Sequence, residues 1–386
     1  MKKQQNIPLT VPNLSGNEIK YVTDCIKTGW ISSAGSYVEK FEERVKNYTE
    51  SKYGIATVNG TSALHIALKL MNIKNDDYVI IPNLTFVATA NAVKYLEAEP
   101  ILIDIDPIYW QIDLDILEEF LLNNTIIKDD GKCYHKCDNK HIAAILTVNM
   151  QGNMGDIYRL LKIGKEYNIE IIEDAAESLG TTFDDKHAGT FGRLGCLSFN
   201  GNKIISSGGG GLILTDNQDL ASEAKHLTTT AKTDPFAYFH DKIGYNYRLV
   251  NILAAIGLAQ MEQLDNFLIK KKYIGNYYYK NLSNIGDIEF QGVLPMVDHN
   301  NWLYTIKTTN QKKLIDYLNK NYITCRPIWT PMNHLPMYSN CLYITETDVS
   351  NYIFESCLSI PCSTNILDVE LERVVDTIKD FYEKNE

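Results

Sequence analysis

The chain has 386 residues, of which 45% are hydrophobic and 22% charged, as is typical of a globular protein large enough for two domains. Its formal net charge of −11 argues against nucleic-acid binding, because such proteins usually present a basic face. No apolar stretch approaches the length of a bilayer-spanning helix, and the first lysines are not followed by the apolar run of a signal peptide. We therefore expect a cytoplasmic protein that does not insert into membranes.

The eight cysteines are spread along the chain, and without a secretion signal we expect them to remain free thiols. One cluster stands out, because Cys133, His135, Cys137 and His141 lie within nine residues. These are zinc-ligand types, but no second ligand pair follows at the distance seen in zinc fingers. We interpret residues Asn123–His141 as a polar, irregular surface insertion and keep zinc as the weaker alternative. The predicted functional site contains no metal.

Two amphipathic helices are predicted near the N-terminus. Apolar residues at helical spacing predict helices over Asn17–Thr28 and Tyr37–Tyr48. The loop between them, Gly29–Ser36, consists largely of small residues. It serves either as a plain connection or as a substrate loop, since small residues allow a ligand to approach the backbone closely.

The middle of the chain alternates short apolar runs with helical patterns. The apolar runs predict strands over Tyr53–Val58, Tyr78–Ile81, Ile101–Ile105, Ile142–Val148, Glu170–Glu173, Cys196–Phe199 and Gly211–Leu214. The intervening patterns predict helices over Ala63–Met71, Asn83–Leu96, Ile112–Leu122, Asp156–Tyr167 and Gln218–Thr229. Alternation of this kind implies an α/β fold with a largely parallel sheet. A further helix is predicted over Tyr247–Gln263, continuing as one long helix through Tyr279.

The last hundred residues differ in pattern from the rest and predict a smaller α+β domain. The expected strands are Trp302–Lys307 and Ile323–Arg326, and the expected helices are Gln311–Asn319 and Asp368–Tyr382. We therefore predict a large domain over residues 1–282, which includes the long linking helix, and a small domain over residues 283–386.

Polar and small residues gather where the predicted parallel strands end. These segments are Asn59–Ser62, Pro82–Phe86, Asn149–Gly152 and the residues around Asp174. In open α/β sheets, ligands bind at the carboxyl ends of the strands. Thr61 and Ser62 at the start of a helix either bind a phosphate, with help from the free N–H groups of the first turn, or simply cap the helix.

The segment Ile171–Asp216 carries the strongest chemical signal. Asp174 ends an apolar strand, and Lys203 follows on a loop of small residues before the run Gly208–Gly211. This pattern fits pyridoxal 5′-phosphate, in which a lysine forms a Schiff base and an aspartate pairs with the pyridinium nitrogen. Taken alone, Lys203 is equally compatible with a solvated loop lysine and Asp174 with a helix cap. Their combination with the hydroxyl cradle favours the cofactor.

Several sequence motifs resemble those of one enzyme family. They are NGTSALHIAL, PNLTFVATANAV, EDAAES, FGRLGCLSFNGNKIISSGGGG, GYNYRLVNILAAIGLAQMEQLD and GWISSAGSYVEKFE. Together they look like the sugar aminotransferases of the DegT/DnrJ/EryC1/StrS group, and the resemblance covers about residues 7–380. It implies fold type I of the pyridoxal phosphate enzymes, with a mostly parallel seven-stranded sheet in the large domain and a smaller C-terminal α+β domain.

The resemblance also implies a role for each matching residue. Lys203 would hold the cofactor as an internal aldimine and carry protons, Asp174 would pair with the pyridine nitrogen, and Glu177 would lie near the phenolic oxygen, where relatives often have Gln. The remaining contacts would come from the ring-stacking Phe86, from the phosphate ligands Thr61, Ser62 and Ser198, and from Asn246, which would reach the cofactor phosphate of a second subunit. A homodimer with shared active sites follows from the last of these roles.

The implied reaction moves an amino group from L-glutamate, which leaves as 2-oxoglutarate, to the keto carbon of a nucleotide-linked deoxy sugar. The loop NGNKIISSGGGG is similar to enzymes that act on UDP-linked 4-keto-6-deoxy-N-acetylhexosamines in bacillosamine and legionaminic-acid synthesis, and C4 amination is therefore favoured. Such products enter surface glycans such as lipopolysaccharide or capsule. The residues expected to face this substrate are Trp30, Arg326, Trp329 and His334.

Three alternatives to this function remain. A 3-keto sugar aminotransferase would have the same cofactor site, and a sugar dehydratase would use the same cofactor for another reaction. Dehydratase relatives carry His in place of the lysine, so Lys203 argues against the second alternative. The third alternative is a non-catalytic protein that keeps the fold for regulation, but such a protein would have no chemical need for both Lys203 and Asp174.

Overall fold

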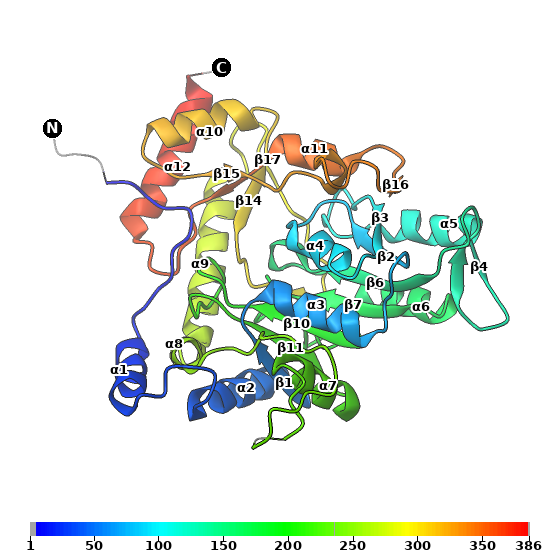
Figure 1. Cartoon of the computed structure of the whole chain (residues 1–386). Coiled ribbons are helices and arrows are strands. Elements are labelled where there is room, and N and C mark those ends of the chain that lie inside the picture. Colours follow the sequence, from blue (N-terminus) through cyan, green and yellow to red (C-terminus); the bar gives the residue numbers. More distant parts are fainter. Residues whose placement is uncertain (1–4, 235, 385–386) are drawn as a thin grey trace.

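The computed structural model describes residues 5–234 and 236–384, and its centre is an eight-stranded sheet (Figure 1). The strand order is β1-β11-β10-β7-β6-β2-β3-β16. The strands are β1 Tyr53–Thr57, β2 Tyr78–Pro82, β3 Glu99–Ile103, β6 Ile142–Val148, β7 Glu170–Asp174, β10 Leu194–Ser198, β11 Gly211–Thr215 and β16 Tyr343–Ile344. All seven strands predicted for the large domain are therefore present, and their ends differ from the prediction by at most two residues.

The sheet is mostly parallel, as predicted. β10, β7, β6, β2, β3 and β16 pair in parallel, whereas β11 is antiparallel to both of its neighbours, β10 and β1. The strand β1 therefore runs in the same direction as β10. The eighth strand was not predicted, because Tyr343 and Ile344 form a run too short to signal a strand until they pair with Leu102 and Ile103 of β3.

Helices bury both faces of this sheet. The first seven are α1 Glu18–Thr28, α2 Ser36–Thr49, α3 Gly60–Leu70, α4 Ala88–Lys94, α5 Leu114–Asn124, α6 Ile157–Glu166 and α7 Gln218–Thr228. Within β2, Val79 and Ile81 pack in one hydrophobic cluster with α3 and α4, while Ile80 packs in another with α5 and α6. Alternate side chains of a strand point to opposite faces, so a sheet covered on both sides needs apolar residues at every position. This explains why its strands are continuous apolar runs.

The helix predicted from Tyr247 through Tyr279 is two helices, α8 Asn251–Met261 and α9 Leu264–Leu282. Residues 247–250 are not helical, because Tyr247 accepts a hydrogen bond from the Val58 backbone and Arg248 forms a bridge with Thr57 beside β1. The break between α8 and α9 falls at residues 262–263, where the Glu262 carboxylate accepts hydrogen bonds from residues on or next to α1. Contacts between distant segments thus override the helical pattern.

The C-terminal part forms a second, smaller sheet with the order β12-β14-β17-β15. Its strands are β12 Glu289–Phe290, β14 Tyr304–Lys307, β15 Arg326–Pro327 and β17 Cys357–Ile360, and the nearby helices are α10 Gln311–Lys320, α11 Val349–Ser356 and α12 Asp368–Glu383. Figure 1 shows α9 running from α8 toward this sheet. The strand predicted over Ile323–Arg326 is largely absent, because Ile323 instead forms a parallel bridge with Ile7 of the N-terminal segment. The division of the chain after residue 282 stays a prediction.

A short three-stranded sheet joins the two parts of the chain. It consists of β8 Thr182–Phe183, β9 Lys186–His187 and β13 Val297–Asp298. Two single-turn 3₁₀ helices, η1 Met150–Gly152 and η2 Met332–His334, lie in loops. Within the described residues, no helix has the length and apolarity needed to cross a membrane.

The expectation of an irregular insertion over Asn123–His141 was wrong. This segment forms a hairpin of β4 Thr125–Ile127 and β5 Cys133–His135, and the Cys133 side chain is buried in the hydrophobic cluster of α5 and α6. The three residues of β4 are all β-branched and favour a strand despite the polarity of the residues around them. Among the described residues, no three His, Cys, Asp or Glu side chains are placed to hold a metal ion.

Candidate active site

The predicted catalytic residues meet at the carboxyl edge of the large sheet. Asp174 is the last residue of β7, and it lies opposite Cys196 of the parallel strand β10. Lys203 follows β10 on a loop, and Glu177 lies in the turn that follows β7. Because the carboxyl ends of neighbouring parallel strands share one edge, residues far apart in the sequence come together there.

Lys203 is a largely buried lysine rather than a solvated loop residue. Its side chain is 13% exposed, and its Nζ lies 3.5 Å from Glu177 Oε1. The same Nζ lies 3.9 Å from the centre of the Trp302 ring, and Trp302 Nε1 donates a hydrogen bond of 2.6 Å to the backbone oxygen of Asn202. The amine of Lys203 therefore lies between a carboxylate and an aromatic face.

Asp174 is a buried carboxylate with few partners. Its Oδ2 accepts a hydrogen bond of 2.7 Å from the Thr89 hydroxyl, and its Oδ1 accepts one of 3.2 Å from the Ala176 N–H. Burial raises the pKa of Asp174, while these hydrogen bonds and the charge of Lys203 act in the opposite direction. No helix begins at Ala176, so the alternative role as a helix cap does not apply. A cation bound next to this carboxylate would be strongly favoured.

Two neighbouring glutamates have different environments. Glu173 accepts N–H hydrogen bonds of 2.7 Å from Gly189, Phe191 and Gly192, so its carboxylate is fully used in fixing a loop. Among the described residues, the Glu177 carboxylate accepts only the Gln151 N–H at 2.9 Å and the long contact with Lys203. Burial raises the pKa of Glu177 to about 7, although Lys203 opposes the shift. This side chain can therefore hold or release a proton near neutral pH.

The hydroxyl cradle forms where α3 begins. Asn59 caps this helix by accepting a hydrogen bond of 2.8 Å from the Ser62 N–H, so neither Thr61 nor Ser62 serves as the cap. A Cβ on Gly60 would lie only 2.8 Å from the Ser198 Cβ, which places Ser198 directly against the first turn. Across the described residues, no hydrogen bond is formed by the hydroxyls of Thr61, Ser62 or Ser198. Free hydroxyls beside a helix N-terminus fit a phosphate group.

The glycine run lies against the start of α3. A Cβ on Gly211 would lie 2.4 Å from the Asn59 backbone oxygen. Gly208 adopts a φ of +81°, which side-chain-bearing residues rarely adopt. The run therefore forms the turn that supports the start of α3.

A chain of aromatic rings connects Phe86 to the lysine. Trp302 stacks on Trp329 with ring centres 6.0 Å apart, and Trp329 meets Phe86 edge-on at 6.5 Å. Phe86 is 52% exposed and lies before α4, not in its first turn as predicted, because the helix begins only at Ala88. The contact of Trp302 with the lysine was not predicted, because no local sequence pattern links this residue to the lysine loop.

The other predicted residues lie further out. Trp30, Arg326 and His334 are exposed, and no contact recorded in the described residues joins them to Lys203, whereas Trp329 belongs to the aromatic chain. Asn246 is exposed and bridges to Thr229 within its own chain. The exposure of Asn246 leaves it free to contact a second subunit.

Comparison with known proteins agrees with this site. The sequence pattern of the DegT/DnrJ/EryC1/StrS aminotransferase family matches residues 12–379. The chain is 33% identical to GDP-perosamine synthase of Escherichia coli O157:H7, over 97% of this chain and 98% of that protein. It is equally similar, at 33%, to the putative pyridoxal phosphate-dependent aminotransferase EpsN of Bacillus subtilis strain 168, over 97% and 95% of the two chains.

Solved structures agree as well. The crystal structure of a DegT DnrJ EryC1 StrS aminotransferase from Brucella abortus superimposes with a TM-score of 0.87 at 25% identity, over 95% of each chain. The fold is therefore that of the fold type I aminotransferases, and the free hydroxyls at α3, the buried Asp174 and the enclosed Lys203 fit a phosphate, a pyridinium and an aldehyde carbon of one cofactor. The chain belongs to the DegT/DnrJ/EryC1/StrS aminotransferase family, and its cofactor is pyridoxal phosphate.

Proposed function

We propose that this protein transfers an amino group from L-glutamate to the keto carbon of a nucleotide-linked keto-deoxy sugar, with C4 as the favoured position. The observation that carries the proposal is the placement of Lys203 Nζ between Glu177 and Trp302, at the strand edge where Asp174 ends β7. A reaction of this kind requires one amine that alternates between holding the cofactor and moving protons. Lys203 is the amine at this edge of the sheet.

Each residue of the site has a separate task. When bound, pyridoxal phosphate supplies an electron sink for the carbon that loses its proton. Asp174 faces the ring nitrogen and keeps it protonated by charge attraction, while Thr61, Ser62 and Ser198 bind the phosphate and Phe86 covers the ring. Lys203 takes the proton from the amino donor and returns one to the sugar carbon. Glu177 sets the charge of the lysine, since the two groups share a buried contact.

The substrate contacts and the dimer belong to the same proposal. We assign Trp30, Arg326, Trp329 and His334 to the sugar nucleotide, and Asn246 to the cofactor phosphate of a second subunit, which makes the homodimer the functional unit. The sequence motifs favour a UDP sugar, while the name of the Escherichia coli relative refers to a GDP sugar. Both nucleotides must therefore be tested. The product would enter surface glycan synthesis.

The proposal is tested by the absorption spectrum of the protein and by identification of the product. Purified protein with added pyridoxal phosphate should absorb visible light, lose this band when glutamate is added, and regain it with a keto sugar. Incubation with UDP- and GDP-linked 4-keto-6-deoxy sugars, followed by NMR, should show a new amine at C4. Turnover only with added 3-keto sugars, with the amine at C3, would identify a 3-keto sugar aminotransferase, and loss of a hydroxyl would identify a dehydratase. A band that never responds to glutamate would support a regulatory protein and refute the proposal.

A further inference from the structure

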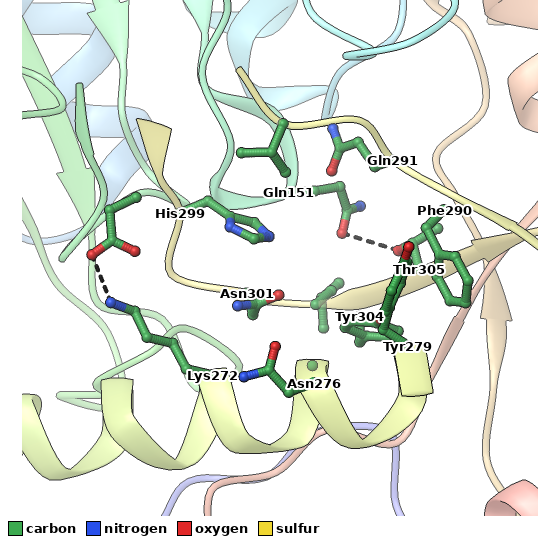
Figure 2. A pocket seen from close by; sticks show the side chains of 14 residues that line it. Gln151, Lys272, Asn276, Tyr279, Phe290, Gln291, His299, Asn301, Tyr304 and Thr305 are labelled. Atoms are coloured by element: carbon green, nitrogen blue, oxygen red, sulfur yellow. Dashed lines mark hydrogen bonds and ion pairs between the residues drawn. The ribbon is translucent and has the colours of Figure 1, made fainter. Parts of the chain in front are cut away.

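A second cavity lies behind the active site, between α9, β14 and the segment that leads from β12 to β14 (Figure 2). It encloses about 390 Å³, which is within the range of small-molecule sites. Lys203, Asp174 and the hydroxyl cradle do not line it. The cavity is therefore separate from the site of amino transfer.

One side of this cavity is aromatic. The rings of Tyr279 and Phe290 have centres 5.2 Å apart, and those of Phe290 and Tyr304 have centres 6.0 Å apart. Tyr279 is 59% exposed, so its ring forms part of an open wall rather than of the packed core. Such a surface fits the flat C–H face of a ring-shaped ligand.

The lining of the cavity also includes amides and an imidazole. Gln151 and Asn301 are 2% and 8% exposed, respectively, and Figure 2 shows their side chains directed into the cavity together with His299. Gln151 Oε1 accepts a hydrogen bond of 3.2 Å from Thr305, while its NH₂ group has no recorded partner among the described residues. Buried amides that face an open cavity need hydrogen-bonding partners, because leaving them unpaired is costly.

The cavity carries little charge. Among the described residues that line it, the only Lys or Arg is Lys272, whose Nζ lies 2.6 Å from the carboxylate of Asp298. Burial lowers the pKa of His299, which favours the neutral imidazole. No free cation among the lining residues is therefore available to bind a phosphate or a carboxylate.

We propose that this cavity binds a neutral sugar, with the sugar's C–H face against Tyr279 and Phe290 and its hydroxyls bonded to Gln151 and Asn301. An aromatic wall together with amides matches the C–H face and the peripheral hydroxyls of a pyranose ring, and the lack of free charge selects against sugar phosphates and nucleotide sugars. The ligand is thus of a different class from the substrate of the amino-transfer site.

Gln151 connects this cavity to Lys203. Its side chain faces the cavity, while its backbone N–H donates a hydrogen bond of 2.9 Å to Glu177, which contacts the lysine. Its φ of 62° is unusual for a residue other than glycine, so this turn has little room to adjust. A bound sugar that moves Gln151 would change the environment of Glu177. This second step depends on the proposed function, whereas sugar binding does not.

The binding step is tested on the full chain loaded with pyridoxal phosphate. The probes are methyl glycosides of glucose, mannose and N-acetylglucosamine, with glucose 1-phosphate as the charged comparison, measured by saturation-transfer NMR and by calorimetry. We expect at least one methyl glycoside to bind, and glucose 1-phosphate to bind at least fivefold more weakly. Absence of binding by all methyl glycosides, or tighter binding of the phosphate, would overturn the proposal.

Point variants show where on the protein the glycoside binds. Tyr279→Ala should weaken the glycoside at least fivefold, whereas Tyr273→Ala, a change on the same helix but outside the cavity lining, should leave the affinity unchanged. Lys203→Ala should also leave it unchanged. If Lys203→Ala abolishes binding, the glycoside occupies the amino-transfer site and the proposal fails. These binding results do not depend on turnover, so failure of the proposed function would leave them interpretable.

Discussion

The Lys203 site and the β4–β5 hairpin both concentrate titratable side chains, yet they use them differently. In the hairpin, His135 Nδ1 lies 2.9 Å from Asp138, and His141 Nδ1 lies 3.3 Å from Asp77, so each imidazole has its own carboxylate. In the Lys203 site, two buried carboxylates share one lysine. The carboxylates of the hairpin are paired within the chain, whereas we propose that the second carboxylate of the Lys203 site pairs with the ring nitrogen of the cofactor.

The same contrast appears within a single motif. Glu173 and Glu177 are four residues apart and both buried, but Glu173 accepts three short N–H hydrogen bonds while Glu177 retains a weak contact with the lysine. Both residues are buried glutamates, so burial and residue type do not distinguish them. What distinguishes the glutamate that contacts the lysine from the structural one is that its hydrogen bonding is incomplete.

Lys203→Ala tests the contrast with the largest expected effect. Without the amine, the protein should lose its visible absorbance with pyridoxal phosphate, and amino transfer should fall by about 10⁴-fold or more, because the proton carrier is lost. The exposed Lys186 of β9 provides the control, and Lys186→Ala should keep both properties. A yellow, active Lys203→Ala enzyme would show that the amine is elsewhere.

Glu177→Gln tests the role of the incompletely paired carboxylate. Burial raises the pKa of Glu177 from 4.5 to about 7, so the folded state retains a proton that the unfolded state releases across this interval. Stability from this group therefore falls as the pH rises from about 4.5 to 7. The stability of Glu177→Gln relative to wild type should increase between pH 5 and pH 8, by up to about 3 kcal/mol.

Urea unfolding of cofactor-free protein at both pH values measures this difference. The exposed Glu170 of β7, the strand that precedes the turn of Glu177, serves as the matched control, and Glu170→Gln should show the same relative stability at both pH values. The pH–activity profile of Glu177→Gln should also lose its change near pH 7. An unchanged pH dependence in both measurements would show that Glu177 does not titrate in this range.

Sequence patterns predicted the parts of the site that local spacing defines. Asp174 follows an apolar strand and Lys203 follows on a loop of small residues, so both were found from the pattern alone. Trp302 was missed because it reaches the lysine from the loop that precedes β14, and no local pattern encodes that approach. The roles of the cofactor-contacting residues remain predictions until they are tested.

The secondary structure likewise has parts that local spacing predicts and parts that it does not. The seven long apolar strands were predicted, whereas the two-residue strand β16 was not, since it is a strand only through pairing with β3. The junction of α8 and α9 was missed for a related reason. Glu262 contacts Asn17 and Tyr21, and such contacts between distant segments do not alter the helical spacing of apolar residues.

Trp302→Phe tests the newly identified neighbour of the lysine. The variant keeps an aromatic face but loses the 2.6 Å hydrogen bond from Nε1 to the Asn202 oxygen, and phenylalanine attracts a cation less strongly than tryptophan. Loss of one hydrogen bond is worth about 1 kcal/mol, so we expect kcat to fall about five- to tenfold. A change confined to KM would instead assign Trp302 to substrate binding. Thermal unfolding shows whether the fold is intact.

Asp138→Asn tests the hairpin, in which each of the two imidazoles has its own carboxylate, and should have the smallest effect. Burial acts to raise the pKa of Asp138, but hydrogen bonds from Tyr78 and His135 outweigh it and hold the pKa at about 2. The carboxylate therefore stabilises the folded state above about pH 4, and this contribution is lost as the pH falls toward 2. Since the side chain is 37% exposed, we expect a loss of only about 1 kcal/mol in urea unfolding at pH 7.

Amino transfer by Asp138→Asn should remain within about twofold of wild type, because the hairpin makes no recorded contact with Lys203 and distant, independent sites behave additively. His141→Asn is the matched variant, because it removes the other imidazole–carboxylate pair, His141 with Asp77, and should behave in the same way. A large loss of activity without a loss of stability in either variant would mean that the hairpin, despite its complete pairing, takes part in function. The pairing of titratable side chains would then no longer distinguish the hairpin from the Lys203 site.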